Sequence, residues 1–154
     1  MLLRRNHLEP PPIALAQLKR YAEAALGAAD PGELLGSEGN AARIYFGNFS
    51  GLLKGACDDG VPTPFNFEFT QRNGRPPTDP VNALLSFAYS MLSRDLTIIC
   101  PRTGFDQFDG FYRRPRFGRP ARALDLMIEF NPLVAGTVVI GAINNAMVGP
   151  EDFI

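Results

Sequence analysis

Apolar residues recur every three or four positions over most of the chain, and this period predicts an all-α fold. Gly27 follows the first such stretch, as a glycine commonly follows the end of a helix. The residues between the stretches, above all 57–80, are rich in glycine, proline, aspartate and asparagine and indicate loops. We therefore expect helices at residues 13–26, 30 to about 53, 79–100, 121–130 and 133–147.

Two of these helices carry clear start signals. Asp30 and Asp79 are capping residues, and each is followed by a proline at the first helical position. Glu33 stands three residues after the first cap, the spacing of a capping box. The two aspartates are therefore expected to accept hydrogen bonds from the first helical turns.

The helix that begins at Asp79 has an apolar face expected to pack in the core. Asn82, Ser86 and Ser90 fall on its other faces. The apolar, β-branched run 96–100 could form a short strand, but no partner strand is evident and we favour continued helix. The predicted core face consists of Val81, Leu84, Leu85, Ala88 and Leu92. The last helix, 133–147, is apolar almost all round and is predicted to be buried.

Glu38 falls inside the apolar stripe of the second helix, four residues after Leu34 and four before Ala42. A carboxylate on a buried face is costly unless it is paired, protonated or bound to a cation. Glu38 is therefore either a metal ligand or acid–base group, or a carboxylate at the rim that pairs with an arginine.

Length and composition indicate one globular domain. The chain has 154 residues, 45% of them hydrophobic and 20% charged, with a net charge of −1. Cys57 and Cys100 are isolated, so neither a zinc site nor a disulfide framework is implied. We see no signal peptide and no apolar run of membrane-spanning length, and we expect a cytoplasmic protein with no membrane partner.

Positive charge is local rather than global. Of the 15 basic residues only Lys19 and Lys54 are lysines, and arginine offers a bidentate fork for phosphate. The stretch FYRRPRFGRPARALDLMIEF combines a basic loop with a helix that carries Asp125 and Glu129 one turn apart. A basic loop before an acidic helix suits a site that holds a phosphate backbone and acts on it with a metal, but a solvated loop before a surface helix gives the same pattern.

Four blocks of the sequence resemble, in order, the C-terminal helical domain of the CRISPR adaptation integrase-endonuclease, Cas protein one. They are LLGSEGNAARIYFGNFSGLL, RNGRPPTDPVNALLSFAYSMLSRDL, GFYRRPRFGRPARALDLMIEF and NPLVAGTVVIGAINNAMVGPEDFI. Residues 1–12 resemble the family's interdomain junction, which leaves 13–154 as the helical domain. The resemblance implies a helical bundle-like domain without the family's N-terminal β domain, truncated at both ends.

The resemblance also implies a function and partners. The family forms a homodimer, assembles with the small Cas protein two, and inserts captured DNA into a CRISPR array in antiviral defence. The implied partner is duplex or branched DNA, from the CRISPR repeat and the spacer precursor. The implied cofactor is Mn²⁺ or Mg²⁺.

The family's metal ligands map only in part onto this chain. The glutamate of the EGNAAR block falls on Glu38, and Asp125 matches an acid of the later helix. The family's histidine falls on Arg113 and its remaining acid on Ile128, and neither side chain can ligate a metal. Glu129 is a conceivable substitute, one position away on the helix. We expect catalysis to be impaired.

Three hypotheses follow. In the first, the chain is a metal-dependent DNA endonuclease and integrase, with Glu38 and Asp125 as its catalytic and metal-binding residues. In the second, it is a non-catalytic DNA-binding or assembly fragment of the same family. In the third, it is a helical protein-interaction domain unrelated to DNA. The arginines expected to hold DNA are Arg72, Arg75, Arg113, Arg114, Arg116 and Arg119.

Overall fold

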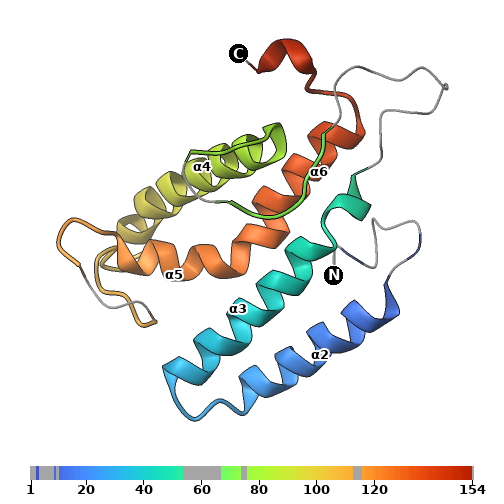
Figure 1. Cartoon of the computed structure of the whole chain (residues 1–154). Coiled ribbons are helices and arrows are strands. Elements are labelled where there is room, and N and C mark those ends of the chain that lie inside the picture. The colour runs from blue at the N-terminus through green and yellow to red at the C-terminus, as the bar shows by residue number, and fades with distance from the viewer. Residues whose placement is uncertain are drawn as a thin grey trace.

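The computed structural model is built of helices joined by loops, and its described residues form no strand (Figure 1). These residues are 3, 9, 11–53, 67–73, 76–112 and 116–153. The predicted all-α class is thereby confirmed. The elements are α2 (Pro12–Leu26), α3 (Pro31–Gly47), η1 (Ser50–Leu52), α4 (Pro80–Arg102), α5 (Ala121–Phe130), η2 (Asn131–Gly136), α6 (Thr137–Asn144) and η3 (Pro150–Asp152).

Both predicted helix caps are formed. Asp30 Oδ1 accepts hydrogen bonds from the backbone N–H groups of Gly32 at 2.6 Å and Glu33 at 3.0 Å. The Glu33 carboxylate accepts in return from the N–H of Ala29 at 2.9 Å. Asp79 accepts from the N–H of Asn82 at 2.8 Å at the start of α4. These bonds satisfy donors that the first turn of a helix leaves open.

The second helix is shorter than predicted. α3 ends at Gly47, not near Leu53, and the chain continues as the 3-10 turn η1. Asn48 ends the helix, because its side-chain amide donates to the carbonyl of Ile44 at 2.8 Å. The apolar period in the sequence continues past this point because Leu52 is also fully buried. Leu52 belongs to η1, however, and not to α3.

The third helix runs through the segment that could have been a strand. α4 continues to Arg102, so the helical alternative for residues 96–100 is confirmed. Thr103 then ends it, with a hydroxyl that contacts the carbonyl oxygens of Ile99 at 3.1 Å and Cys100 at 3.0 Å.

The last apolar stretch is one helical path in three parts, α5, the π-helical segment η2 and α6. The prediction that it is buried all round was wrong. Val139 and Ile140 are each 3% exposed, whereas Leu133 is 64% and Val138 61% exposed. Only one side of this helical path therefore packs into the core.

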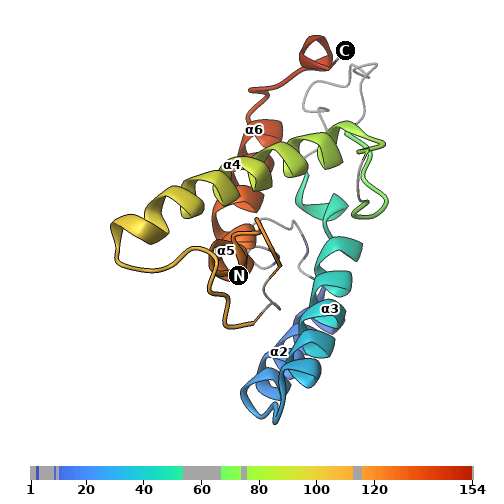
Figure 2. The same cartoon turned by 90° about the vertical axis from the view of Figure 1, so that its left-hand side faces the viewer.

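The helices form two groups (Figures 1 and 2). α2 and α3 run side by side as an antiparallel pair, and α4 packs across the α5–α6 path. A shared core connects the groups, and Asn144 adds a hydrogen bond from α6 to the carbonyl of Leu52 at 2.9 Å. The buried core residues are Leu3, Phe49, Leu52, Phe69, Val81, Leu85, Val139, Ile140 and Ile143.

Two helical stretches are longer and more apolar than we predicted from the sequence. Pro80–Arg102 and Ala121–Asn144 are long and apolar enough to cross a membrane, by length and composition alone. The expectation that no run reaches this length was therefore wrong. Core helices pass the same test, and both stretches place residues in the shared core.

Tyr45 makes a testable contribution to the core. Its phenolic oxygen is buried and has no hydrogen-bond partner in the described part of the chain, and burial raises the pKa of this phenol above its ordinary value. Because the folded state keeps Tyr45 neutral while the unfolded chain ionises near pH 10, Tyr45 costs stability as the pH rises above that value. We expect Tyr45→Phe to raise the free energy of unfolding by about 0.5–1 kcal/mol at pH 7 and by more above pH 10. Urea titrations at pH 7 and pH 10.5 measure this, and an equal effect at both values would contradict the argument.

Candidate functional site

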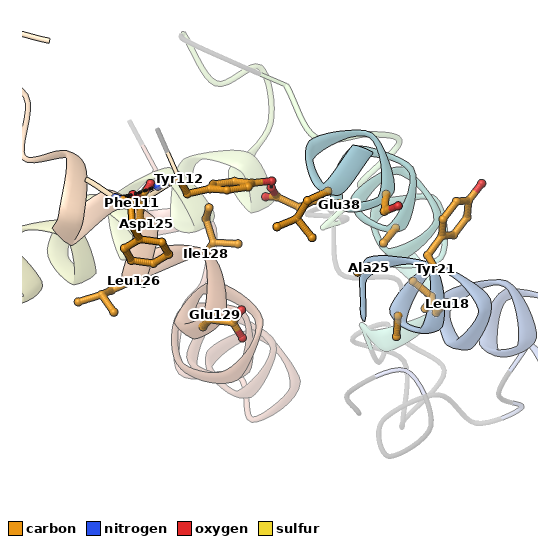
Figure 3. A pocket seen from close by; sticks show the side chains of 14 residues that line it. Leu18, Tyr21, Ala25, Glu38, Phe111, Tyr112, Asp125, Leu126, Ile128 and Glu129 are labelled. Atoms are coloured by element: carbon orange, nitrogen blue, oxygen red, sulfur yellow. Dashed lines mark hydrogen bonds between the residues drawn. The ribbon is translucent and has the colours of Figure 1, made fainter. Parts of the chain in front are cut away.

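A pocket of about 330 Å³ lies between the α2–α3 pair and α5 (Figure 3). Its walls bring together residues far apart in the sequence, which include Glu38 from α3, Tyr112 from the loop before α5, and Asp125, Ile128 and Glu129 from α5. The remaining lining residues are Leu18, Tyr21, Ala22, Ala25, Leu34, Ser37, Ala41, Phe111 and Leu126. The three acids singled out from the sequence thus share one pocket.

Glu38 is half-buried at this pocket and has a specific partner. Its carboxylate accepts a hydrogen bond of 2.8 Å from the hydroxyl of Tyr112 (Figure 3). Among the described residues, Glu38 pairs with this tyrosine hydroxyl. The alternative interpretation had instead required an arginine. This contact joins α3 to the basic loop, across 74 positions of sequence.

Asp125 is only 2% exposed and holds the same loop from the other side. One carboxylate oxygen accepts hydrogen bonds from the backbone N–H groups of Phe111 at 2.9 Å and Tyr112 at 2.8 Å. Bonds from N–H groups to an ionised carboxylate are stronger than those between neutral groups. Asp125 therefore fixes the backbone that leads directly into the arginine-rich segment.

The described residues around this pocket offer few ligands to a divalent cation. One oxygen of Glu38 is bonded to Tyr112 and one of Asp125 to two backbone amides, while Ile128 offers only hydrocarbon. Among the described residues there is no group of three His, Cys, Asp or Glu side chains that could hold a metal. Mg²⁺ is held in proteins by one or two carboxylates together with waters and substrate oxygens, so Glu38 and Asp125 are the minimum of such a set and Ile128 adds no ligand to it.

Glu129 also lines the pocket, although it is an exposed residue. Figure 3 shows Ile128 below the Tyr112–Glu38 contact and the Glu129 carboxylate farther from it. Glu129 does not complete a three-acid group in the described structure. Its role as a substitute ligand remains a prediction.

The predicted DNA-binding arginines fall into three sets. Arg116 is exposed and Arg119 half-buried in the turn before α5, where Gly118 adopts a φ of +71°. Arg72 lies elsewhere, against α4. Three others, Arg75, Arg113 and Arg114, lie outside the described residues.

Arg122 fixes the start of the loop, a role that sequence reasoning missed. Its guanidinium forms a salt bridge with Asp109 at 3.0 Å and donates to the carbonyl of Asp106 at 3.1 Å. It also lies over the ring of Phe105, 5.2 Å from the ring centroid. The loop is thus held by Arg122 at one end and by Asp125 at the other.

Asn82 is the second missed residue. The sequence placed it off the core face, but it is 0% exposed and joins the 67–73 segment to α4. Its amide oxygen accepts from Arg72 at 2.7 Å and from the N–H of Asn73 at 3.1 Å. Its amide nitrogen donates to Asp79 at 2.6 Å and to the carbonyl of Gln71 at 2.9 Å. One indication of this role was visible in the sequence, where Asn82 lies three residues after the helix cap Asp79.

The family model described as CRISPR associated protein Cas1 matches residues 2–154. The chain belongs to the Cas1 family. It is 46% identical over 159 residues to the CRISPR-associated exonuclease Cas4/endonuclease Cas1 fusion of Geobacter sulfurreducens, covering 99% of this chain and 28% of the relative. It is 39% identical over 153 residues to CRISPR-associated endonuclease Cas1 3 of Thermus thermophilus, covering 99% of this chain and 42% of the relative.

A solved structure supports the same assignment of this Cas1-family chain. A chain of a partial Cas6-RT-Cas1–Cas2 complex superposes with a TM-score of 0.79 at 30% identity, over 92% of this chain and 39% of that chain. The likeness confirms both the predicted family and the helical domain. The Cas1-family chain spans less than half the length of each of these relatives.

Proposed function

We propose that this chain serves CRISPR spacer acquisition as a DNA-binding Cas1-family domain whose own cleavage and integration chemistry is impaired. The observation that carries the proposal is the pocket, in which Glu38 and Asp125 keep the family's acidic positions while Ile128 occupies a third. The carboxylates hold the basic loop through Tyr112 and its neighbouring backbone. The acids therefore serve to position the loop, which in turn serves to bind DNA.

The basic loop is suited to phosphate contacts because the residues just before its arginines are anchored. Arg122 and Asp125 fix residues 106–112, so the arginines that follow begin from a defined point beside the pocket. Arginine forks bind phosphate oxygens in pairs, and each neutralised phosphate releases counterions. Local clustering of arginine supplies this attraction although the net charge of the chain is −1.

The proposed partners follow from the family. One solved neighbour is described as a Cas6-RT-Cas1–Cas2 complex, which supports assembly of this chain with a Cas2 protein. We include a homodimer, duplex or branched DNA from the CRISPR repeat and the spacer precursor, and a cytoplasmic location in the same proposal. We propose Mn²⁺ or Mg²⁺ as a cofactor only for Cas1-family members that carry all of the family's metal-ligand residues.

A second candidate function is the metal-dependent endonuclease and integrase. It is favoured by one observation, which is that Glu38, Asp125 and Glu129 line the same pocket. Nicking of branched DNA by the unaltered chain with Mn²⁺, abolished by Glu38→Ala, would establish this function in place of the first. We expect no metal-dependent nicking.

DNA binding is tested by its salt dependence. We expect the chain to bind branched DNA, with an affinity that falls steeply between about 50 and 200 mM salt. Replacing Arg114 and Arg116 by alanine should reduce the slope of log K against log salt by roughly 1.8, because each lost phosphate contact removes about 0.9. Fluorescence anisotropy with a labelled branched duplex measures both values.

The matched control removes two positive charges from α2, by changing Lys19 and Arg20 to alanine. Both residues are exposed and neither lines the pocket. The control should keep the slope close to that of the unaltered chain. Equal slopes for all three proteins, or no binding at low salt, would exclude the basic loop as the DNA contact.

A further inference from the structure

A second pocket of about 490 Å³ lies between α4 and α5. α5 divides it from the first pocket, because Leu124 and Met127 face the second while Asp125, Ile128 and Glu129 face the first. Its character is also different, since none of its described lining residues carries a carboxylate. They are Arg72, Ser86, Tyr89, Ser90, Ser93, Leu124 and Met127.

Arg72 brings to this pocket a half-buried positive charge whose partners among the described residues are all neutral. Its guanidinium donates to the side-chain oxygens of Asn82 at 2.7 Å and Ser86 at 3.1 Å, and to the carbonyl of Asn73 at 2.6 Å. In the part of the chain that the structure describes, no carboxylate lies within salt-bridge distance of Arg72. A half-buried charge of this kind is costly unless an opposite charge joins it.

Asp79 does not supply that charge. It belongs to the same hydrogen-bond network, but one of its oxygens accepts from the N–H of Asn82 at 2.8 Å and the other from the Asn82 side chain at 2.6 Å. Asn82 therefore stands between the acid and the arginine. Arg72 therefore lines the pocket without an ion-pair partner among the described residues.

The other polar residues that line this pocket can donate hydrogen bonds. The ring of Tyr89 lies 5.3 Å from the Arg72 guanidinium carbon, and burial raises the pKa of its phenol while Arg72 acts in the opposite direction. The phenol therefore keeps its proton at neutral pH. Ser93 lines the pocket with a hydroxyl that has no bond to another described residue, whereas Ser90 donates to the carbonyl of Ser86 at 2.8 Å. A cation with neutral hydroxyl donors around it is suited to an oxyanion.

We propose that this second pocket binds the phosphate group of a nucleotide or of a nucleic-acid strand. Arg72 supplies the charge, Ser93 and Tyr89 supply hydroxyl donors, and the apolar wall of Leu124 and Met127 packs against the sugar or base. The volume exceeds the needs of a phosphate ion and matches pockets that hold small organic ligands. The phosphate site is inferred from the geometry of this pocket alone. It rests on the proposed function only where DNA is named as the natural source of the phosphate.

The test uses thymidine 5′-monophosphate as the probe, with thymidine, inorganic phosphate and a short DNA strand in parallel. Calorimetry at constant ionic strength should show saturable binding of the monophosphate and none of thymidine. Ser93→Ala should weaken binding about three- to tenfold, the loss of one hydrogen bond. Ser93→Asp, which places a carboxylate beside Arg72, should abolish it. Equal affinity in these two variants and the unaltered chain would overturn the proposal.

Arg72 is tested separately because it also supports the fold. Arg72→Lys keeps the charge but loses the planar fork, and should weaken binding at least tenfold. NMR of the arginine side-chain N–H groups should show Arg72 shifting with the monophosphate, and an unshifted Arg72 signal would overturn the site. The DNA strand separates the two proposals. Binding of DNA without the monophosphate would refute this pocket alone, and binding of the monophosphate without DNA would refute only the DNA-binding function.

Discussion

Replacing Arg113 by histidine and Ile128 by aspartate is expected to create divalent-metal affinity in a chain that we expect to bind no metal. Ile128→Asp adds a carboxylate to a pocket that already holds Glu38 and Asp125. Arg113→His replaces a fixed cation by a nitrogen ligand at the position where the family resemblance places the histidine. We expect calorimetry to show Mn²⁺ binding with a dissociation constant on the order of 0.1–1 mM, typical of weak oxygen-rich sites. The unaltered chain should show no heat of binding.

The single variants and a third substitution provide the controls for this experiment. Ile128→Asp alone should bind far more weakly than the pair, because Arg113 still opposes the cation. Adding Glu38→Gln to the pair should remove the gained affinity. Circular dichroism checks that aspartate at the half-buried position 128 is tolerated. Metal affinity in the unaltered chain, or none in the folded double variant, would show that the ligand positions are wrongly placed.

Asn82→Ala is expected to destabilise the fold far more than the loss of an exposed polar side chain. It removes a fully buried side chain with four hydrogen bonds, and leaves the Asn73 N–H and the Gln71 carbonyl without their partner. Buried polar groups without partners cost about 1–3 kcal/mol each, so we expect the free energy of unfolding to fall by about 3–4 kcal/mol. Urea denaturation followed by circular dichroism measures the change.

The control is Asn40→Ala, the same chemical deletion on α3. As far as the structure is described, the Asn40 side chain bonds only within its own helix, to the carbonyl of Gly36 and to Arg43. We expect a change within about 0.5 kcal/mol, as for other exposed substitutions. Comparable losses for the two variants would mean that Asn82 does not join the 67–73 segment to α4.

The parts of the fold that depend on local chemistry could be predicted from the sequence. Asp30 and Asp79 allowed two helix starts to be predicted, because a capping carboxylate, a proline and the first-turn amides are close neighbours in the chain. The end of α3 was missed because the apolar period continues through η1, and period alone does not show that Asn48 turns back on Ile44. Burial of the last helix was overestimated, because composition does not show which faces meet a neighbour.

Some residues of the candidate site could also be predicted from local sequence, and others could not. Glu38 was found because a carboxylate inside an apolar stripe is unusual. Asp125 was found because it lies on an acidic helix directly after a basic loop, and the family resemblance matched it to a family acid. Tyr112 and Asn82 could not be found, because their roles depend on partners in other segments. Tyr112 reaches Glu38 only after the α2–α3 pair and α5 pack around one pocket.

The π-helical segment η2 determines how α5 and α6 are oriented around their common path. Each α-helical residue turns the path by about 100°, so inserting or deleting one residue at 131–136 would rotate α6 by that angle relative to α5. Val139, Ile140 and Ile143 would then leave the core, while Asp125 kept its place. In this segment the number of residues matters more than their identity: exposed Leu133 and Val134 can change, but the segment cannot change length.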